Sequence, residues 1–307
     1  MTSPDPQVAA VVEAIRAADP SGAISGNVFR NAFDYLYDGQ RTGRYRPDQL
    51  SKTEKTHCGS LVEIYFRRAL DGVIGDGVAL DFSIADLDVD CKYSFTMGAW
   101  MLPPECFGKL LLVAHADDVA GHWSLGVVRA LKDYLRAGAN RDAKTGLNSL
   151  GRQAVQWIFE RAELPANALL ALPPADVEAV FQPTSGQKRV NELFRRAQLI
   201  PISRMVVATV AQQDDYMKRV RYNGGARSAL QAEGFLIPGG DYDAHRQVAL
   251  DLGAPDVAPG EFVSFRVVEA SVGTSQAIEL EGAFWRIAER HEPSTRPAPK
   301  LPSTLRY

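Results

Sequence analysis

Apolar residues recur at helical spacing in the N-terminal part of the chain, and this periodicity predicts three helices. Residues 6–18 and 22–37 form the first two, each with one apolar face that is most simply a packing surface. A longer helix is expected to begin at Asp48, a favourable N-cap residue, and to carry Leu61 and Tyr65 on its apolar stripe.

Two short segments after these helices alternate between apolar and polar residues, as strands do. Residues 78–84 set Asp81 on the face opposite their apolar side chains, and residues 87–93 set Asp90 and Lys92 opposite theirs. Because only a short turn separates the two segments, a β-hairpin would bring Asp81 near Asp90. One face of this hairpin is expected to pack into the core, and the other to hold the side chains that take part in chemistry.

The second half of the chain has the pattern of a separate domain. Residues 165–174 contain three prolines and are expected to link residues 1–164 to residues 175–307, because the chain is long for one domain. Helices are predicted in the second domain at 187–197, 205–211 and 214–221.

A short helix then ends at Gly234 and is followed by an extended apolar segment. That order resembles a winged helix-turn-helix, in which the helix with Arg227, Ser228 and Gln231 would enter the major groove of DNA. An ordinary helical bundle with a basic, solvated face explains the same pattern equally well.

The C-terminal part of this domain is predicted to contain further extended structure. Residues 262–268 form a strand, and residues 277–290 begin extended and turn helical. The proline-rich tail from Pro293 is expected to be loose.

Composition excludes several classes of protein. Hydrophobic residues make up 46% and charged residues 23%, and no uncharged apolar run is long enough to span a membrane. The first residues have neither the basic region nor the apolar core of an export signal. Cys58, Cys91 and Cys106 lack the spacing of a zinc site or a disulfide framework. We therefore expect a cytoplasmic protein with no membrane partner.

The cations are unevenly distributed. A net charge of −3 argues against a protein that coats nucleic acid. However, residues 187–227 contain nine cations against three acids, and residues 41–68 contain seven against three. Two basic segments in an otherwise acidic protein indicate contact with phosphate at chosen places.

The hairpin side chains indicate metal-dependent hydrolysis of a phosphodiester. Carboxylates bind a divalent cation, while a lysine two residues away orients the attacking water and offsets developing negative charge. Glu63 on the preceding helix is a third candidate acid, although a solvent-exposed pair with Arg67 explains it at least as well. An isolated Asp-x-Lys on a strand is ordinarily a solvated face, but the second aspartate and the basic loops favour a nuclease.

His115, Asp117, Asp118 and His122 lie around a predicted turn between two further strands. They could form a second metal site, but aspartate is common in turns because its side chain bonds the local backbone. We favour the turn.

Taken together, these residues resemble the NaeI family of type II (type IIE) restriction endonucleases. The resemblance rests on residues 55–57, Glu63, Asp81, residues 90–92, the basic segment 141–144, and residues 206–213 and 227–230, and it covers nearly the whole chain. The general PD-(D/E)xK signature has a proline where this chain has Leu80.

The resemblance implies a two-domain α/β (α+β) protein. A restriction-endonuclease-like PD-(D/E)xK core would occupy residues 1–164, and a winged helix-turn-helix related to that of catabolite activator proteins would occupy residues 175–307. It also implies a homodimer that cleaves palindromic double-stranded DNA with Mg²⁺, leaving 5′-phosphate and 3′-hydroxyl ends. A second copy of the site would bind as an allosteric effector.

The resemblance also assigns roles by position. Asp81, Asp90 and the Cys91 carbonyl would bind Mg²⁺, and Lys92 would position the attacking water. Glu63 would complete or support the metal site, with Glu54 on the same helix as the alternative.

Basic and polar residues of both domains are the candidate DNA contacts. They are Arg41, Arg44, Arg46, Lys55, Arg141, Lys144, Lys188, Arg189, Lys218, Arg219, Arg221, Asn223, Arg227, Ser228 and Gln231.

Two other functions compete with this one. A DNA repair or nicking endonuclease would use the same centre, and a non-catalytic DNA-binding regulator would have lost its metal ligands, which are present here. The recognition sequence, the choice between blunt and staggered ends, and the identity of the base-specific contacts stay open.

Overall fold

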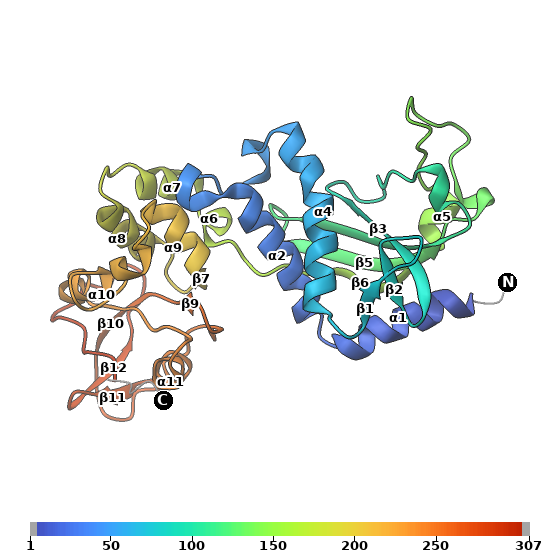
Figure 1. The fold of residues 1–307 in the computed structure, drawn as a ribbon. Coiled ribbons are helices and arrows are strands. Elements are labelled where there is room, and N and C mark those ends of the chain that lie inside the picture. Colours follow the sequence, from blue (N-terminus) through green and yellow to red (C-terminus); the bar gives the residue numbers. More distant parts are fainter. Residues whose placement is uncertain (1–4, 303–307) are drawn as a thin grey trace. The chain divides into compact units, whose positions relative to one another are not determined.

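The computed structural model describes residues 5–302 and divides into two compact units. Unit 1 contains residues up to 36 and residues 46–165, and unit 2 contains residues 37–45 and those from 166 onward. Figure 1 shows the elements of both units. Among the described helices, none combines the length and the apolar character needed to cross a membrane.

Unit 1 is a sheet with helices. Its elements are α1 (Pro6–Ala18), α2 (Ala23–Tyr37, which ends at the first residue of unit 2), α4 (Lys52–Ala69), β1 (Ile74–Asp76), β2 (Phe82–Ile84), β3 (Leu87–Ser94), β4 (Leu110–Asp117), β5 (His122–Arg129), α5 (Ser149–Gln153) and β6 (Gln156–Glu163), with short 3₁₀ turns at Pro47–Gln49, Pro104–Cys106 and Lys132–Tyr134.

The six strands lie in the order of the sequence, β1 to β6, in one mixed sheet. All neighbours are antiparallel except β3 and β4, which run parallel with Asp90 opposite Leu111. The central strand β4 is buried along almost its whole length. A strand buried on both sides makes a rigid base for the side chains of its neighbour β3.

Helix α4 packs on the sheet against β3 and β1, and Figure 1 shows it crossing the strands. Helix α2 reaches the sheet through Phe29. Phe29 of α2 packs edge-on against Phe66 of α4, with ring centroids 5.5 Å apart. The same ring also contacts Tyr93 of β3 and Trp123 of β5. These aromatic contacts connect the predicted helices to the strand that carries Asp90 and Lys92.

Two details of unit 1 differ from the sequence prediction. Asp48 lies in a 3₁₀ turn, and the long helix begins at Lys52, where Ser51 and Glu54 form a capping box. Strand β2 begins only at Phe82, and Val78 is 97% exposed. The reason is that Asp88 accepts the backbone N–H groups of Val78 and Ala79, which turns this segment out of the sheet.

Unit 2 consists of small helices and short strands. They are α3 (Gly39–Thr42), α6 (Ala168–Ala171), α7 (Pro174–Phe181), α8 (Gly186–Arg196), β7 (Ile202–Ser203), α9 (Arg204–Ala211), α10 (Ala226–Ala229), β8 (Phe235–Leu236), α11 (Asp243–Asp251), β9 (Glu261–Phe262), β10 (Phe265–Ala270), β11 (Ile278–Leu280) and β12 (Ala283–Ile287), with 3₁₀ turns at Tyr216–Arg219 and Gln231–Glu233.

Two buried clusters hold unit 2 together. One is formed mainly by α6 to α10, and the other by α11, the sheet β11-β12-β10-β8 and the C-terminal segment. Gly39 belongs here because a Cβ at this position would lie 2.1 Å from Thr209 Oγ1 of α9. This close approach explains why residues 37–45 join unit 2, which no local pattern predicted.

The C-terminal predictions are partly wrong. Residues 277–290 contain two strands, β11 and β12, and no helix. The tail was expected to be loose, yet Ala298 and Leu301 are only 2% and 5% exposed, since they pack into the second cluster. Residues 303–307 of that tail lie outside the described chain.

Candidate active site

The hairpin predicted from the sequence is present in unit 1. Strands β2 and β3 pair antiparallel, with Phe82 opposite Val89 and Ile84 opposite Leu87. Ala85 and Asp86 form the turn with φ angles of 53° and 60°. Two successive positive φ angles match the twist of a tight hairpin. The register of the pair therefore agrees with the alternating pattern.

Asp81 lies just before β2 rather than within it. Its Oδ2 accepts the backbone N–H of Cys91 at 2.8 Å. The carboxylate thus reaches across the hairpin to the middle of β3, next to Asp90. This contact agrees with the prediction that Asp81 lies near Asp90. Asp81 itself precedes the strand in which it was expected.

Asp90 and Lys92 form an ion pair on β3. Lys92 Nζ also donates to the Cys91 carbonyl at 3.2 Å. Asp90 is only 5% exposed, so this face of the strand is not an open, solvated surface. The buried Cys106 thiol donates a hydrogen bond to Asp90, a contact that no sequence pattern indicated.

Helix α4 contributes Glu63 and Arg67, one helical turn apart. Arg67 Nη2 lies 3.5 Å from Glu63 Oε1 and donates to the Asp81 carbonyl at 2.6 Å. Its Nη1 lies 3.1 Å from Asp76, and the guanidinium packs over the Phe82 ring. The alternative to a metal-site role for Glu63 was a solvent-exposed pair with Arg67. This pair is present, and it lies at the hairpin.

Glu54 has a different place on α4. Its Oε2 accepts the backbone N–H of Ser51 at 2.8 Å, which caps the start of the helix. Glu63 is the acid whose pKa the charges of Asp81 and Asp90 affect. Of the two candidate glutamates, Glu63 is therefore the one that lies with the hairpin.

The electrostatics of the cluster favour a bound cation. Burial and the charge of Asp81 raise the pKa of Glu63, against the opposing effect of Arg67 and Lys92. Burial also raises the pKa of Asp90 despite its contacts with Lys92. Burial opposes the charge of Lys92, but the ion pair with Asp90 holds its pKa above the usual value. Carboxylates that resist ionisation in this way are stabilised by added positive charge.

The donor set suits Mg²⁺ better than a softer metal. Asp90 Oδ2 is buried, and its charged partner in the described chain is the Lys92 ammonium. Within residues 5–302, no group of three or more His, Cys, Asp or Glu side chains could hold a metal by itself. Mg²⁺ commonly uses one or two carboxylates and completes its shell with water and substrate phosphate. Two aspartates and a backbone carbonyl fit that requirement.

The candidate DNA contacts of unit 1 lie near its surface. Arg46 Nε lies 2.7 Å from Asp48, and this pair is largely exposed. Lys55 lies in the first turns of α4, and Arg141 and Lys144 are exposed on the loop before α5. These positions are accessible to DNA. The DNA contact itself stays a prediction.

Several candidate contacts of unit 2 already have partners. Arg41 pairs with Asp38, Arg44 Nε donates to the Tyr37 carbonyl, and Arg189 donates to the Ala211 carbonyl. Lys218 and Arg219 both pair with Asp215. Arg41 and Lys218 are nevertheless exposed, as are Lys188, Arg221 and Asn223.

The predicted recognition helix is one turn long, α10, followed by a 3₁₀ turn. Arg227 Nε donates to the Ile237 carbonyl at 2.8 Å, Ser228 donates to the Gly225 carbonyl, and Gln231 donates to the Ala298 carbonyl. These contacts lie within unit 2. Their role in DNA contact stays a prediction.

The proposed turn after β4 is confirmed. Asp117 accepts the backbone N–H groups of Val119 and Ala120, and Asp118 forms a buried ion pair with Arg30 of α2. These aspartates therefore have structural partners.

Comparison with known proteins identifies the family of the chain. The family model described as restriction endonuclease NaeI matches residues 9–296. The type II restriction enzyme NaeI of Lentzea aerocolonigenes is 45% identical over 97% of this chain and 95% of its own length. The chain therefore belongs to the NaeI family of type II restriction endonucleases, which are site-specific deoxyribonucleases.

Proposed function

We propose that the protein hydrolyses double-stranded DNA at a palindromic site in the presence of Mg²⁺, leaving 5′-phosphate and 3′-hydroxyl ends. The observation that carries this proposal is the arrangement of Asp81, Asp90, the Cys91 carbonyl and Lys92 on one hairpin. Family membership supports the reaction class.

Asp81, Asp90 and the Cys91 carbonyl would hold Mg²⁺, with Glu63 supporting the site from α4. The bound ion would supply positive charge to the scissile phosphate and to the attacking water. Lys92 is held in place by Asp90 and by the Cys91 carbonyl. Its ammonium would hold the attacking water in line with the phosphorus and offset the charge that develops on the phosphate oxygens.

The finer organisation is also proposed from the family. Unit 2 would contain the winged helix-turn-helix and bind a second copy of the site as effector. The chain would act as a homodimer, because each chain carries one hairpin centre and double-strand cleavage of a palindrome uses two. The basic residues of both units support contact with DNA.

Asp90→Ala and Lys92→Ala test the site. Each is expected to lower the cleavage rate by about 10²–10³-fold or more, because a charged group at the reacting phosphate is lost. Specific DNA binding should survive, since neither side chain has a role in recognition. Plasmid cleavage in Mg²⁺ and gel-shift binding without Mg²⁺ measure the two properties.

Asp86→Asn is the matched control. Asp86 is an exposed residue of the same hairpin, and its positive φ suits asparagine. Cleavage by this variant should equal that of wild type. If Asp90→Ala or Lys92→Ala also cleaved at nearly the wild-type rate, the site assignment would be wrong.

A nicking or repair endonuclease would use the same single centre per chain. The products of a supercoiled plasmid with one site separate the two functions. Linear product without accumulation of nicked circles is expected for the restriction enzyme. Nicked circles that persist would favour the alternative.

A further inference from the structure

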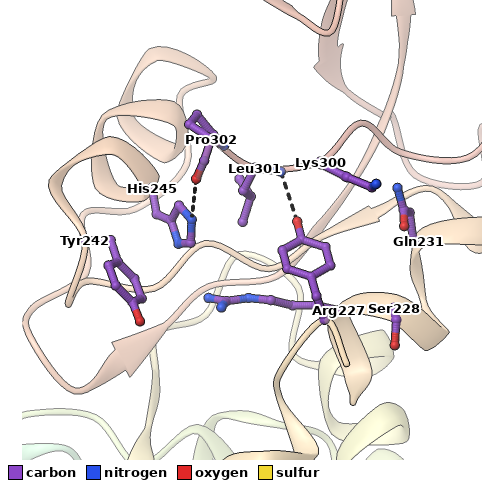
Figure 2. Close-up of a pocket in the computed structure, with 9 residues that line it drawn as sticks. Arg227, Ser228, Gln231, Tyr242, His245, Lys300, Leu301 and Pro302 are labelled. Carbon is purple, nitrogen blue, oxygen red and sulfur yellow. Dashed lines mark hydrogen bonds between the residues drawn. The ribbon is translucent and has the colours of Figure 1, made fainter. Parts of the chain in front are cut away.

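A cavity of about 570 Å³ lies within unit 2 and shares no residue with the hairpin centre. Figure 2 shows its lining, which comes from α10, the following 3₁₀ turn, α11, the residues just before α10 and α11, and the C-terminal segment. The lining residues are Tyr222, Arg227, Ser228, Gln231, Tyr242, His245, Lys300, Leu301 and Pro302.

Arg227 lines the cavity, and its guanidinium has a buried donor that is not satisfied. Its guanidinium lies 5.8 Å from the ring centroids of both Tyr222 and Phe262, which hold it in place. Nη2 is buried and has no hydrogen-bond partner in the described chain. The carboxylate that affects its pKa, Asp241, is already paired with Arg204. Nε already donates to the Ile237 carbonyl, so the unmet group is the buried Nη2 donor. Burying a charged donor without an acceptor is unfavourable, and an anionic oxygen would satisfy it.

His245 supplies an acceptor beside this cation. Its Nε2 lies 3.2 Å from the Pro302 carbonyl, which can only accept, so Nε2 carries the hydrogen. Burial, together with the charge of Arg227, lowers the pKa of His245 to about 4, and the ring is therefore neutral near pH 7. Nδ1 is then an acceptor, and it is buried and unpartnered in the described residues. A ligand that satisfies His245 must donate a hydrogen bond.

The other polar groups add positive charge and further donors. Lys300 is exposed, and residues 5–302 provide no ion pair for it. The Tyr222 hydroxyl accepts the Leu301 N–H at 2.9 Å and keeps its own hydrogen for another partner. Ser228 and Gln231 already donate to backbone carbonyls. The Glu281 carboxylate accepts the Lys300 backbone N–H at 3.0 Å, so one acid also lies beside the cavity. The lining side chains themselves combine two cations, Arg227 and Lys300, with the acceptor Nδ1 of His245.

We propose that this cavity binds a phosphate monoester or inorganic phosphate. Its charged oxygens would accept from Arg227 and Lys300, and its P–OH group would donate to His245 Nδ1. A phosphate monoester keeps a P–OH near pH 6 because its second pKa is about 6. A backbone phosphodiester and a sulfate ion carry no such hydrogen at that pH, so the donor requirement distinguishes them.

Two sources could supply this group: the 5′-phosphate end of a DNA strand and a free phosphate compound. Nη2 and Nδ1 are covered by their neighbours, so binding includes a small rearrangement of side chains, as is common at binding surfaces. The proposal does not depend on the cleavage chemistry of unit 1.

Calorimetry of the full-length protein tests the proposal. The protein is titrated at about pH 6 with inorganic phosphate and, at the same ionic strength, with sulfate. Saturable binding of phosphate is expected, with sulfate weaker by about tenfold, which is the effect of one lost hydrogen bond to a buried group. Absence of saturable phosphate binding, or equal affinity for the two anions, would overturn the proposal.

Variants locate the site. Arg227→Met is expected to weaken phosphate binding by about tenfold or more. Lys300→Met changes an exposed side chain and should weaken phosphate binding severalfold. Arg246→Gln is the matched control, because Arg246 neighbours His245 on α11 but forms an exposed pair with Asp256. If Arg227→Met fails to fold, Lys300→Met decides: unchanged affinity for phosphate would place the anion elsewhere.

Oligonucleotides without Mg²⁺ identify the source. Strands of one sequence with a 5′-phosphate or a 5′-hydroxyl compete with inorganic phosphate. Displacement by the phosphorylated strand alone supports the DNA end as ligand, and displacement by neither supports a free phosphate compound. Equal displacement by both strands would contradict selectivity for a monoester.

Discussion

Arg67 connects three parts of the carboxylate cluster. It contacts the Asp81 carbonyl, Glu63 and Asp76 at once. Since Asp81 lies outside the strand, its position depends on such contacts more than on the sheet. We therefore regard Arg67 as a positioning residue for the carboxylate cluster.

Arg67→Met is expected to lower the cleavage rate by about tenfold, since a charged hydrogen bond at a partly exposed position is lost. The Mg²⁺ concentration for half-maximal cleavage should rise as well, and Arg67→Lys should restore part of the activity. Arg68→Met, an exposed neighbour, is the control. An unchanged Mg²⁺ dependence for Arg67→Met would show that Arg67 does not position the carboxylates.

His245 makes the stability of unit 2 depend on pH. Its pKa is lowered from 6.5 to about 4 in the folded protein, so between these values the unfolded chain binds more protons. Stability is therefore lost as the pH falls through this range, by up to about 3 kcal/mol. Denaturant unfolding of His245→Gln should show a flatter dependence on pH than wild type. A slope equal to that of wild type would contradict the assignment.

At the scale of elements, the β2–β3 hairpin shows what the sequence can predict. Alternation along 87–93 and the short turn define its register, since a one-residue slip would exchange the faces of Asp90 and Val89. The position of Asp81 was less predictable, because Asp88 draws the preceding segment away from the sheet.

Contacts between distant segments were not predictable from local periodicity. The hydrogen bond from Cys106 to Asp90 depends on the connection between β3 and β4, which run parallel. The place of residues 37–45 in unit 2 depends on the fit of Gly39 against Thr209. Neither leaves a repeating pattern of apolar residues in the sequence.

Helix α2 is tied to the β4–β5 turn by a buried ion pair. Arg30 and Asp118 are 6% and 5% exposed, and Nη1 lies 2.5 Å from Oδ1. Arg30→Met would remove the cation that pairs with the Asp118 and Asp34 carboxylates, and breaking a buried ion pair costs about 3–5 kcal/mol. Denaturant unfolding of unit 1 measures this loss.

Arg46→Met is the control for that prediction, because the Arg46–Asp48 pair is exposed. Its effect on the free energy of unfolding should stay within about 0.5 kcal/mol. Equal effects of the two substitutions would mean that the Arg30 pair contributes nothing beyond a surface contact.

At the scale of the whole molecule, the two units suit a division between cleavage and a second DNA contact. The hairpin centre lies entirely in unit 1, and the larger basic segment lies in unit 2. Under the proposed two-site function, a plasmid with one site is cleaved slowly, and an added oligonucleotide containing the site accelerates cleavage. A scrambled oligonucleotide is the control. Equal cleavage rates with both oligonucleotides would contradict the proposal that a second copy of the site acts as effector.

The most direct test of the central claim is to map the ends that the purified protein produces. A long DNA of known sequence is incubated with the protein and Mg²⁺, and every fragment end is sequenced. We expect cuts at one palindromic sequence, with 5′-phosphates on the ends. No cuts are expected when Asp90→Ala replaces the wild type. Cuts scattered without a common sequence, or the same cuts made by Asp90→Ala, would contradict it.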